Sequence, residues 1–249
     1  MRSALARMLA ALAVASAMTG VGAGQAAEAS TTHAAAQPPA KTFPAILNGR
    51  TKLVPGDSGP VVRAVQRHLR AAGIPVNLNG RSDTSTYDAV AHLQEKFLLI
   101  PVGNVNASTL RVLLRITAPG TAMPKACRKA DYALCVSKTQ RVVRVVRDGK
   151  VVRTLDARFG ADGFRTRNGT HRVIRKVRDE YSTRYNARMP YSLYFFGGQA
   201  VHYSDGFAAD GYSGASHGCV NVRDLKAIAR VFKQTPIGTP VVIYGRDRG

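Results

Sequence analysis

The sequence predicts a small three-helix bundle followed by a mostly-β domain with one or two helices. Apolar residues recur at helical spacing through residues 51–118. From Cys135 onward they gather instead in short β-branched runs, separated by turn signals such as Asp148-Gly149. We therefore expect one domain over residues 51–118 and a second over residues 125–249.

Within the first domain, turn and cap residues divide the apolar pattern into three helices. Gly59-Pro60 precedes a helix that ends before Gly73, because proline is tolerated in the first helical turn and glycine ends helices. A second helix begins near Ser85. Asn106 can cap the third helix.

The second domain has the turn signals of a β fold. Asp148-Gly149 joins two Val-rich runs as a hairpin, and Gly197-Gly198 joins the strands of another. Residues 222–233 show helical spacing, and Pro240 to Tyr244 form a closing strand. This predicts one helix immediately after Cys219.

The N-terminus indicates export. Arg2 and Arg7 surround the start of an Ala-rich apolar run, which small residues follow. We predict a signal peptide over residues 1–27 and a flexible linker over residues 28–50, so the mature chain is secreted and keeps no stable membrane span. A retained membrane anchor is the alternative, although the run is short for a bilayer.

The net charge of +21 favours a polyanionic neighbourhood. Nucleic acid is not the predicted partner, because the basic residues are spread along the chain without a basic helix, zinc-finger spacing or aromatic RNA-binding strand. Anionic wall polymers or a membrane surface satisfy the same electrostatics.

The chain has three cysteines, and secretion changes how they are interpreted. Cys127 and Cys135 flank a short polar stretch and are a candidate disulfide. Cys219 then has no partner, and a free thiol in a secreted chain needs a use.

Cys219 lies in the segment Ser216-His217-Gly218-Cys219-Val220-Asn221, between a glycine-rich loop and the predicted helix. A helix N-terminus would stabilise a thiolate and lower the pKa of Cys219. His202 is the better general base than His217, because residues two apart on a tight loop seldom face each other. Backbone N–H groups at Gly218 and Cys219 could form an oxyanion hole.

Two other interpretations of these residues stay open. A buried structural cysteine with two satisfied histidines would have no chemistry. A zinc site formed by His202, His217 and Cys219 would suit the metal's preference for N and S ligands, although the spacing is unusual and no further ligand motif exists. We predict no metal and no cofactor.

The first domain resembles a known family. Its order of Gly-Asp-x-Gly, Val-x-x-Val-Gln-x-x-Leu, Thr-x-x-Ala-Val-x-x-Leu-Gln and Gly-Asn-Val-x-x-x-Thr-Leu, with Gln66 and Gln94 in matching places, is similar to peptidoglycan-binding domain 1. The resemblance covers about 60 residues and implies binding to the glycan and peptides of the cell wall.

Residues 125–245 resemble the L,D-transpeptidase family, whose catalytic domain is a YkuD-like β-sandwich. The resemblance rests on His202 followed by Ser-His-Gly-Cys-Val-Asn, on the early hairpin, and on Met189-Pro190-Tyr191. It implies acyl transfer: Cys219 attacks the carbonyl of the third stem-peptide residue, terminal D-Ala leaves, and an amine of another stem resolves the thioester as a 3→3 cross-link.

The resemblance also assigns roles to the surrounding residues. Cys219 is the nucleophile and His202 the base, which the backbone carbonyl of Tyr203 orients. The supporting and substrate-binding assignments are as follows: His217 and Gly218 shape the oxyanion hole, Ser216 and Asn221 support the loop, and Tyr191 and Phe195 are pocket aromatics.

Three questions stay open at this point. The same acyl-enzyme would serve an L,D-carboxypeptidase or other hydrolase if water replaced the acceptor amine. A wall-binding protein whose catalytic domain has lost activity is the non-enzymatic alternative. The segment between Ser204 and Ala215 would be either a lid or a plain connection.

Overall fold

The structure is a computed structural model in which residues 40–246 are described. The predicted signal peptide and the linker up to residue 39 lie outside the described residues. Among the described helices, none combines the length and the apolar character needed to cross a membrane.

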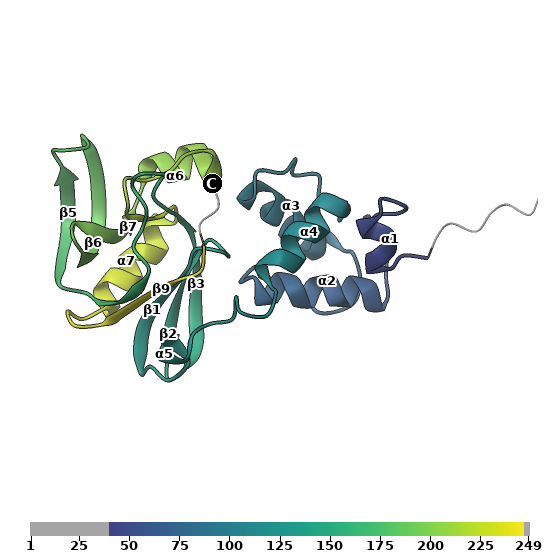
Figure 1. Ribbon diagram of the computed structural model, residues 1–249, viewed down its shortest axis with the longest axis horizontal. Coiled ribbons are helices and arrows are strands. Elements are labelled where there is room, and N and C mark those ends of the chain that lie inside the picture. Colours follow the sequence, from purple (N-terminus) through teal and green to yellow (C-terminus); the bar gives the residue numbers. More distant parts are fainter. Residues whose placement is uncertain (1–39, 247–249) are drawn as a thin grey trace, which may run out of the picture. The chain divides into compact units, whose positions relative to one another are not determined.

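Four helices form the N-terminal part of the described chain (Figure 1). The side chains of Asp83 and Asn106 each accept the backbone N–H three residues on, which explains why α3 and α4 begin where they do. Pro60 occupies the first turn of α2. The bounds are α1 (Phe43–Leu47), α2 (Pro60–Ala71), α3 (Thr84–Lys96) and α4 (Ala107–Ile116).

Helix α1 corrects the linker prediction. It lies inside the segment predicted to be flexible, and the side chain of Ile46 is fully buried in the same apolar core as α2, α3 and α4. A capping Thr42 and a proline in the first turn start this short helix, signals that the alanine-rich composition upstream obscured. The helical domain therefore begins before residue 51.

Two buried glutamines hold the turns of the helical domain in the same way. Gln66 accepts the N–H of Gly80 through Oε1 and donates to the carbonyl oxygen of Arg81. Gln94 accepts the N–H of Gly103 and donates to the carbonyl oxygen of Asn104. The matching positions of these glutamines in the sequence thus have one physical cause: each satisfies the backbone of a turn that the helices cannot pair.

The C-terminal part is one nine-stranded sheet, with the strand order β4-β9-β1-β2-β3-β8-β7-β6-β5. The pairs β1–β9 and β7–β8 are parallel, and the other pairs are antiparallel. The bounds are β1 (Tyr132–Ser137), β2 (Val142–Arg147), β3 (Lys150–Arg158), β4 (Gly169–Arg172), β5 (Arg175–Ser182), β6 (Ala187–Phe196), β7 (Gln199–Tyr203), β8 (Val220–Val222) and β9 (Pro240–Tyr244).

The sheet curls around one core instead of forming two separate sheets. Val136, Leu193 and Ile243, from strands far apart in the sheet order, belong to the same buried apolar cluster. Helix α7 (Leu225–Gln234) adds Ile228 and Val231 to this cluster and lies against β6 and β7 (Figure 1). The mostly-β prediction is confirmed, whereas the predicted sandwich is a single curled sheet.

The helix after Cys219 begins later than predicted. Val220 and Val222 are buried in β8, which pairs with both β3 and β7, and α7 starts only at Leu225, where Asp224 caps it. Pairing with β3 and β7 holds Val222 in an extended strand, and this overrides the helical spacing of residues 222–224.

The cysteine pair Cys127–Cys135 forms a disulfide, with the two Cα atoms 6.1 Å apart. It joins the short helix α5 (Lys125–Arg128) to β1. Cys219 is the free cysteine of the described residues.

A buried ion cluster connects α3 with the sheet. Lys96, whose side chain is 1% exposed, pairs with Asp156 at 2.8 Å. Arg223 pairs with Asp156 at 2.8 Å and with Glu95 at 2.6 Å. Burial alone would raise the pKa of Asp156, but the charge of Lys96 and, next, the hydrogen bond and charge of His92 hold it far below its ordinary value.

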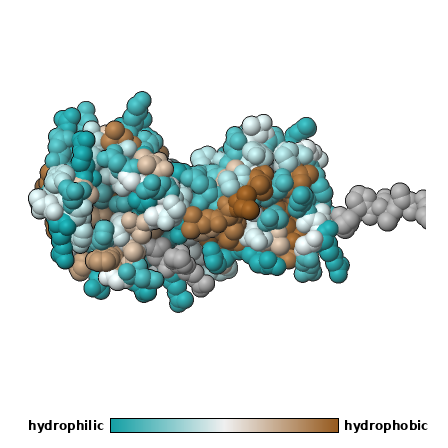
Figure 2. Space-filling view, turned by 90° about the horizontal axis from the view of Figure 1, so that it is seen from above, coloured by the Kyte–Doolittle hydropathy of each residue, from teal (hydrophilic) through white to brown (hydrophobic). Residues whose placement is uncertain are grey.

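The surface is mainly hydrophilic, with an apolar area over the helical part in the face that Figure 2 shows. The connection between α3 and α4 exposes Leu98, Ile100 and Val102. Single exposed apolar residues are common in soluble domains, so these side chains do not by themselves define a binding surface.

Candidate active site

A cavity of about 690 Å³ opens beside Cys219. The β5–β6 hairpin, β7, the segment around α6 (Asp205–Asp210) and the loop that ends at Cys219 all contribute to its walls. Of the residues predicted to act in catalysis, it brings together His202, Ser216, His217, Cys219 and Asn221.

The surroundings of Cys219 differ from the prediction. The residue lies immediately before β8 and not at a helix N-terminus, so no helix dipole stabilises a thiolate there. Burial raises the pKa of the Cys219 thiol, and a hydrogen bond from the backbone N–H of Ala200 lowers it less. The predicted lowering of the pKa is therefore wrong, and the resting group is a thiol at neutral pH.

His202 is buried on β7, with 5% of its surface exposed. Its Nδ1 donates to the carbonyl oxygen of Tyr203 at 2.5 Å, which fixes the tautomer and leaves Nε2 as the basic atom. Burial lowers the pKa of His202 to about 4, so the ring is neutral at pH 7. No hydrogen bond joins His202 to Cys219 within residues 40–246, a looseness that is common in catalytic pairs without substrate.

His217 is exposed at the rim. Its ring stacks on Tyr185, with centroids 4.3 Å apart, and meets Phe164 edge-on at 5.0 Å. These ring contacts hold His217 in place at the edge of the cavity and involve no proton transfer. His217 therefore has the surroundings of a residue that lines the cavity, whereas His202 has those of a base.

Gly218 and Ser216 organise the loop before the cysteine. The backbone of Gly218 has a φ of +111°, and a Cβ there would meet the Gln199 amide at 2.8 Å, so the position requires glycine. The Gly218 N–H donates to Ser216 Oγ at 3.1 Å, and that hydroxyl donates to the carbonyl oxygen of Cys219 at 2.7 Å. The Gly218 N–H is thus occupied, which differs from its predicted place in an oxyanion hole.

Asn221 supports a different segment from the one predicted. Its Nδ2 donates to the hydroxyl of Ser204 at 3.2 Å, and Ser204 caps α6. The segment beyond Ser204 is packed: Phe207 is fully buried and its ring meets Tyr212 at 5.0 Å. Asn221 therefore fixes one end of α6 and not the cysteine loop.

The two predicted pocket aromatics do not line the cavity. Phe195 is 3% exposed in the core of the sheet, and Tyr191 packs against that core and against Phe232. Tyr194 and Tyr185 line the cavity instead. Side chains alternate along β6, so a choice between Tyr194 and Phe195 needs the strand register, which a bulge between β6 and β7 shifts.

The strongest feature that the sequence did not reveal is the charge of the cavity. Four arginines line it, against a single carboxylate, Asp205. They come from three different strands and a turn, so they are scattered in the sequence: Arg158, Arg175, Arg184 and Arg188. Such a lining favours an anionic ligand.

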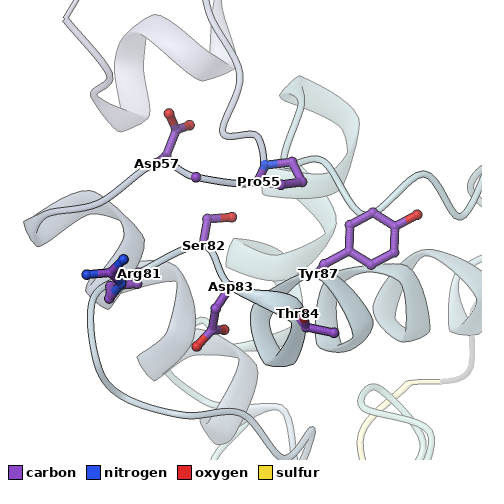
Figure 3. A pocket seen from close by; sticks show the side chains of 8 residues that line it. Pro55, Asp57, Arg81, Ser82, Asp83, Thr84 and Tyr87 are labelled. Carbon is purple, nitrogen blue, oxygen red and sulfur yellow. The ribbon is translucent and has the colours of Figure 1, made fainter.

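A second cavity, of about 380 Å³, lies in the helical domain. Figure 3 shows Asp57, Ser82 and Asp83 around it, with the Tyr87 ring on the side away from Arg81. Asp57 also accepts the backbone N–H of Val54, and Asp83 that of Thr86. These walls offer hydrogen-bond acceptors and one aromatic face.

The described residues hold no group of three or more His, Cys, Asp or Glu side chains that could bind a metal ion. The arrangement around Cys219 instead combines a thiol, a neutral imidazole and cationic walls. Those groups suit nucleophilic attack on an acyl group that carries negative charge nearby.

Family comparisons match both domains. Residues 131–243 match the YkuD model, the L,D-transpeptidase catalytic domain, and residues 58–113 match a putative peptidoglycan binding domain. The two resemblances predicted from the motifs are thereby confirmed. No curated protein is similar enough to the chain to count as a match.

One solved structure supports the fold. An L,D-transpeptidase from Stackebrandtia nassauensis is 23% identical, covers 79% of this chain and 96% of its own, and has a TM-score of 0.54, which shows a shared fold. Two others are an L,D-transpeptidase from Xylanimonas cellulosilytica (27% identity, 84% and 100% coverage, TM-score 0.46) and one from Mycobacterium smegmatis (23%, 42% and 54%, 0.39).

Proposed function

We propose that this chain is a secreted L,D-transpeptidase that forms 3→3 peptidoglycan cross-links through a thioester on Cys219. The observation that carries the proposal is the free cysteine beside a neutral, buried histidine in a cavity within a matched L,D-transpeptidase domain. The matched wall-binding domain supports peptidoglycan as the substrate.

In the first half-reaction, Cys219 Sγ attacks the carbonyl carbon of the third stem residue while His202 Nε2 takes the thiol proton. The C–N bond to the terminal residue then breaks, and the same proton passes to the leaving amine. A neutral imidazole is the right starting form for this step, because it has a free lone pair.

In the second half-reaction, an amine of another stem attacks the thioester. His202 accepts a proton from that amine, the C–S bond breaks, and the proton returns to sulfur as the thiol is restored. The Cys219 N–H is the proposed oxyanion donor, since the Gly218 N–H is already bonded to Ser216.

Incubation with tetrapeptide muropeptides tests this function by mass spectrometry. The proposal predicts cross-linked dimers together with released D-Ala, and neither in Cys219→Ala. Tripeptide monomer as the sole product would identify an L,D-carboxypeptidase. Unchanged tetrapeptide would leave a wall-binding protein without this activity.

Export and wall localisation are part of the same proposal. The evidence is the signal-like N-terminus in the sequence, the disulfide, which persists in oxidising compartments, and the wall-binding domain. The large positive charge suits contact with anionic wall polymers.

A further inference from the structure

Three polar side chains form a row across the middle of the sheet. Arg158 on β3 pairs with Asn221 on β8, and Asn221 pairs with His202 on β7. Because directly paired residues project to the same face, all three side chains lie on the cavity side of the sheet. Their neighbours Ala157, Val220 and Val201 lie in the apolar core on the other face.

Two atoms of this row are buried without a hydrogen bond to any described residue. One is a donor, Arg158 Nε, and the other is an acceptor, Asn221 Oδ1. Arg158 is 7% exposed and Asn221 is 5% exposed. Buried polar atoms are nearly always paired, so an unpaired donor and an unpaired acceptor on directly paired residues of one cavity lining point to a ligand as their partner.

The guanidinium of Arg158 lies over the Phe207 ring and makes its hydrogen bonds with the described residues through Nη1 alone. Its Nη1 donates to the carbonyl oxygens of Gly206 and Gly211, at 3.4 and 3.0 Å, and so holds the segment around α6. The edge formed by Nε and Nη2 makes no hydrogen bond within residues 40–246. Such an edge can bind a carboxylate through two parallel hydrogen bonds.

Protein carboxylates do not neutralise this charge. Burial lowers the pKa of Arg158, the charge of Asp210 offsets this only in part, and the described residues include no ion pair with Arg158. The other cavity arginines are placed differently: Arg175 pairs with Glu180 and lies over the Tyr194 ring, while Arg184 and Arg188 are exposed at the rim.

We propose that Arg158 binds the terminal carboxylate of the residue that leaves the donor stem, while Asn221 Oδ1 accepts a hydrogen bond from its nitrogen. The assignment rests on the proposed function, because it places the leaving group next to His202. Neighbouring strands are about 4.8 Å apart, so the row spans about 10 Å. It runs from His202, which donates the proton, through the acceptor Asn221 to the cation Arg158.

This order matches the chemistry of the leaving group. Its nitrogen must face His202 to receive a proton, and its carboxylate lies one carbon beyond that nitrogen. A released amino acid has an ammonium group for Asn221 and a carboxylate for Arg158. The row would thus select stems that end at the leaving residue, and a carboxamide in place of the carboxylate would be a poor donor.

The test compares two donor tetrapeptides, one with a free C-terminal carboxylate and one with a C-terminal carboxamide. We expect wild-type kcat/KM to favour the carboxylate by about 10- to 100-fold, the range for a hydrogen bond to a charged group. Arg158→Gln should remove most of this preference through a rise in KM for the carboxylate donor. Arg158→Lys should restore part of it, and the rim variants Arg184→Gln and Arg188→Gln should keep the ratio.

An unchanged preference in a folded Arg158→Gln protein would overturn the assignment, as would a wild type without any preference. Arg158 also holds α6, so the thermal midpoint and the iodoacetamide reactivity of Cys219 establish whether that variant is intact. If it does not fold, product inhibition of the wild type decides: D-alanine should inhibit more strongly than D-alaninamide, and equal inhibition would contradict the proposal. A wild type that converts neither donor would instead refute the proposed function itself.

Discussion

Two cavities of the described residues, the one beside Cys219 and the one beside Tyr87, differ in the charge of their walls. The cavity beside Cys219 has four arginines and one aspartate in its walls, whereas the cavity of the helical domain has two aspartates and one arginine. Because the chain has a net charge of +21, the acidic lining of the cavity beside Tyr87 departs from the average composition, whereas the cationic lining beside Cys219 has the same sign as the chain. The difference indicates different ligands. The cationic cavity suits an anionic peptide end, and the cavity with acceptors and an aromatic face suits hydroxyl or amide groups.

Replacing Cys219 by alanine should separate the predicted activity of the cavity beside Cys219 from wall binding by the helical domain, and this is the largest expected effect. We expect muropeptide conversion to disappear, because the only nucleophile in the proposed reaction is gone, while sedimentation with purified cell walls stays at the wild-type level. Mass spectrometry and a pull-down measure the two outcomes on one preparation. Residual dimer formation in the variant would show that another group performs the chemistry.

The pH dependence of Cys219 alkylation tests whether the cavity raises the pKa of the Cys219 thiol. Because burial raises the pKa of the thiol above its ordinary value of 9.0, the thiolate fraction keeps increasing beyond that pH. We expect the iodoacetamide rate to increase by roughly 50- to 100-fold between pH 7 and pH 9, since the thiolate fraction grows about tenfold per pH unit below the pKa. A rate that reaches its plateau by pH 7 would support the thiolate that the sequence predicted.

His202 should make the fold sensitive to acid. Its pKa is about 4 in the folded chain against an ordinary 6.5, so the unfolded chain binds this proton first as pH falls. That difference lowers the free energy of unfolding by about 3 kcal/mol between pH 6.5 and pH 4 and has no effect above that window.

Denaturant unfolding at several pH values measures the effect, with His202→Gln as the comparison. The variant should have a flatter dependence on pH over the same window, whatever its stability at pH 7. Parallel curves for the two proteins would mean that His202 binds a proton as readily in the folded chain as in the unfolded chain, which would contradict a lowered pKa.

The smallest expected effect concerns the helical-domain cavity. Tyr87→Ala removes its aromatic face and should weaken binding to purified cell walls by roughly three- to tenfold, equivalent to about 1 kcal/mol. Conversion of soluble muropeptides should not change. Tyr181→Ala, an exposed tyrosine on β5, is the matched control. An equal loss of cell-wall binding in both variants would mean that this cavity has no specific part in wall binding.

The sequence predicted those parts of the fold that local chemistry determines. Helices α3 and α4 begin where side-chain caps satisfy backbone N–H groups, and the β2–β3 hairpin turns at Asp148-Gly149. Helix α7 was misplaced because β8 exists only through pairing with β3 and β7, which no local pattern encodes. The curl of the sheet has the same non-local origin.

The candidate site also combines features that the local sequence predicts with features that depend on tertiary pairing. Cys219 and His202 were predicted from residue types and spacing, and both line the cavity. The pKa of Cys219, the identity of the cavity tyrosines and the place of Arg158 all depend on strand register and burial. Pairing with Asn221 gives Arg158 its importance, and the two residues are far apart in the sequence.

The central claim is that Cys219 is an acylatable nucleophile in a cavity that accepts a carboxylate. Intact mass spectrometry after incubation with a carbapenem, a reactive acyl compound with a carboxylate, tests it directly. The account predicts one adduct per wild-type chain and none in Cys219→Ala. A folded wild type that remains unmodified would contradict the claim.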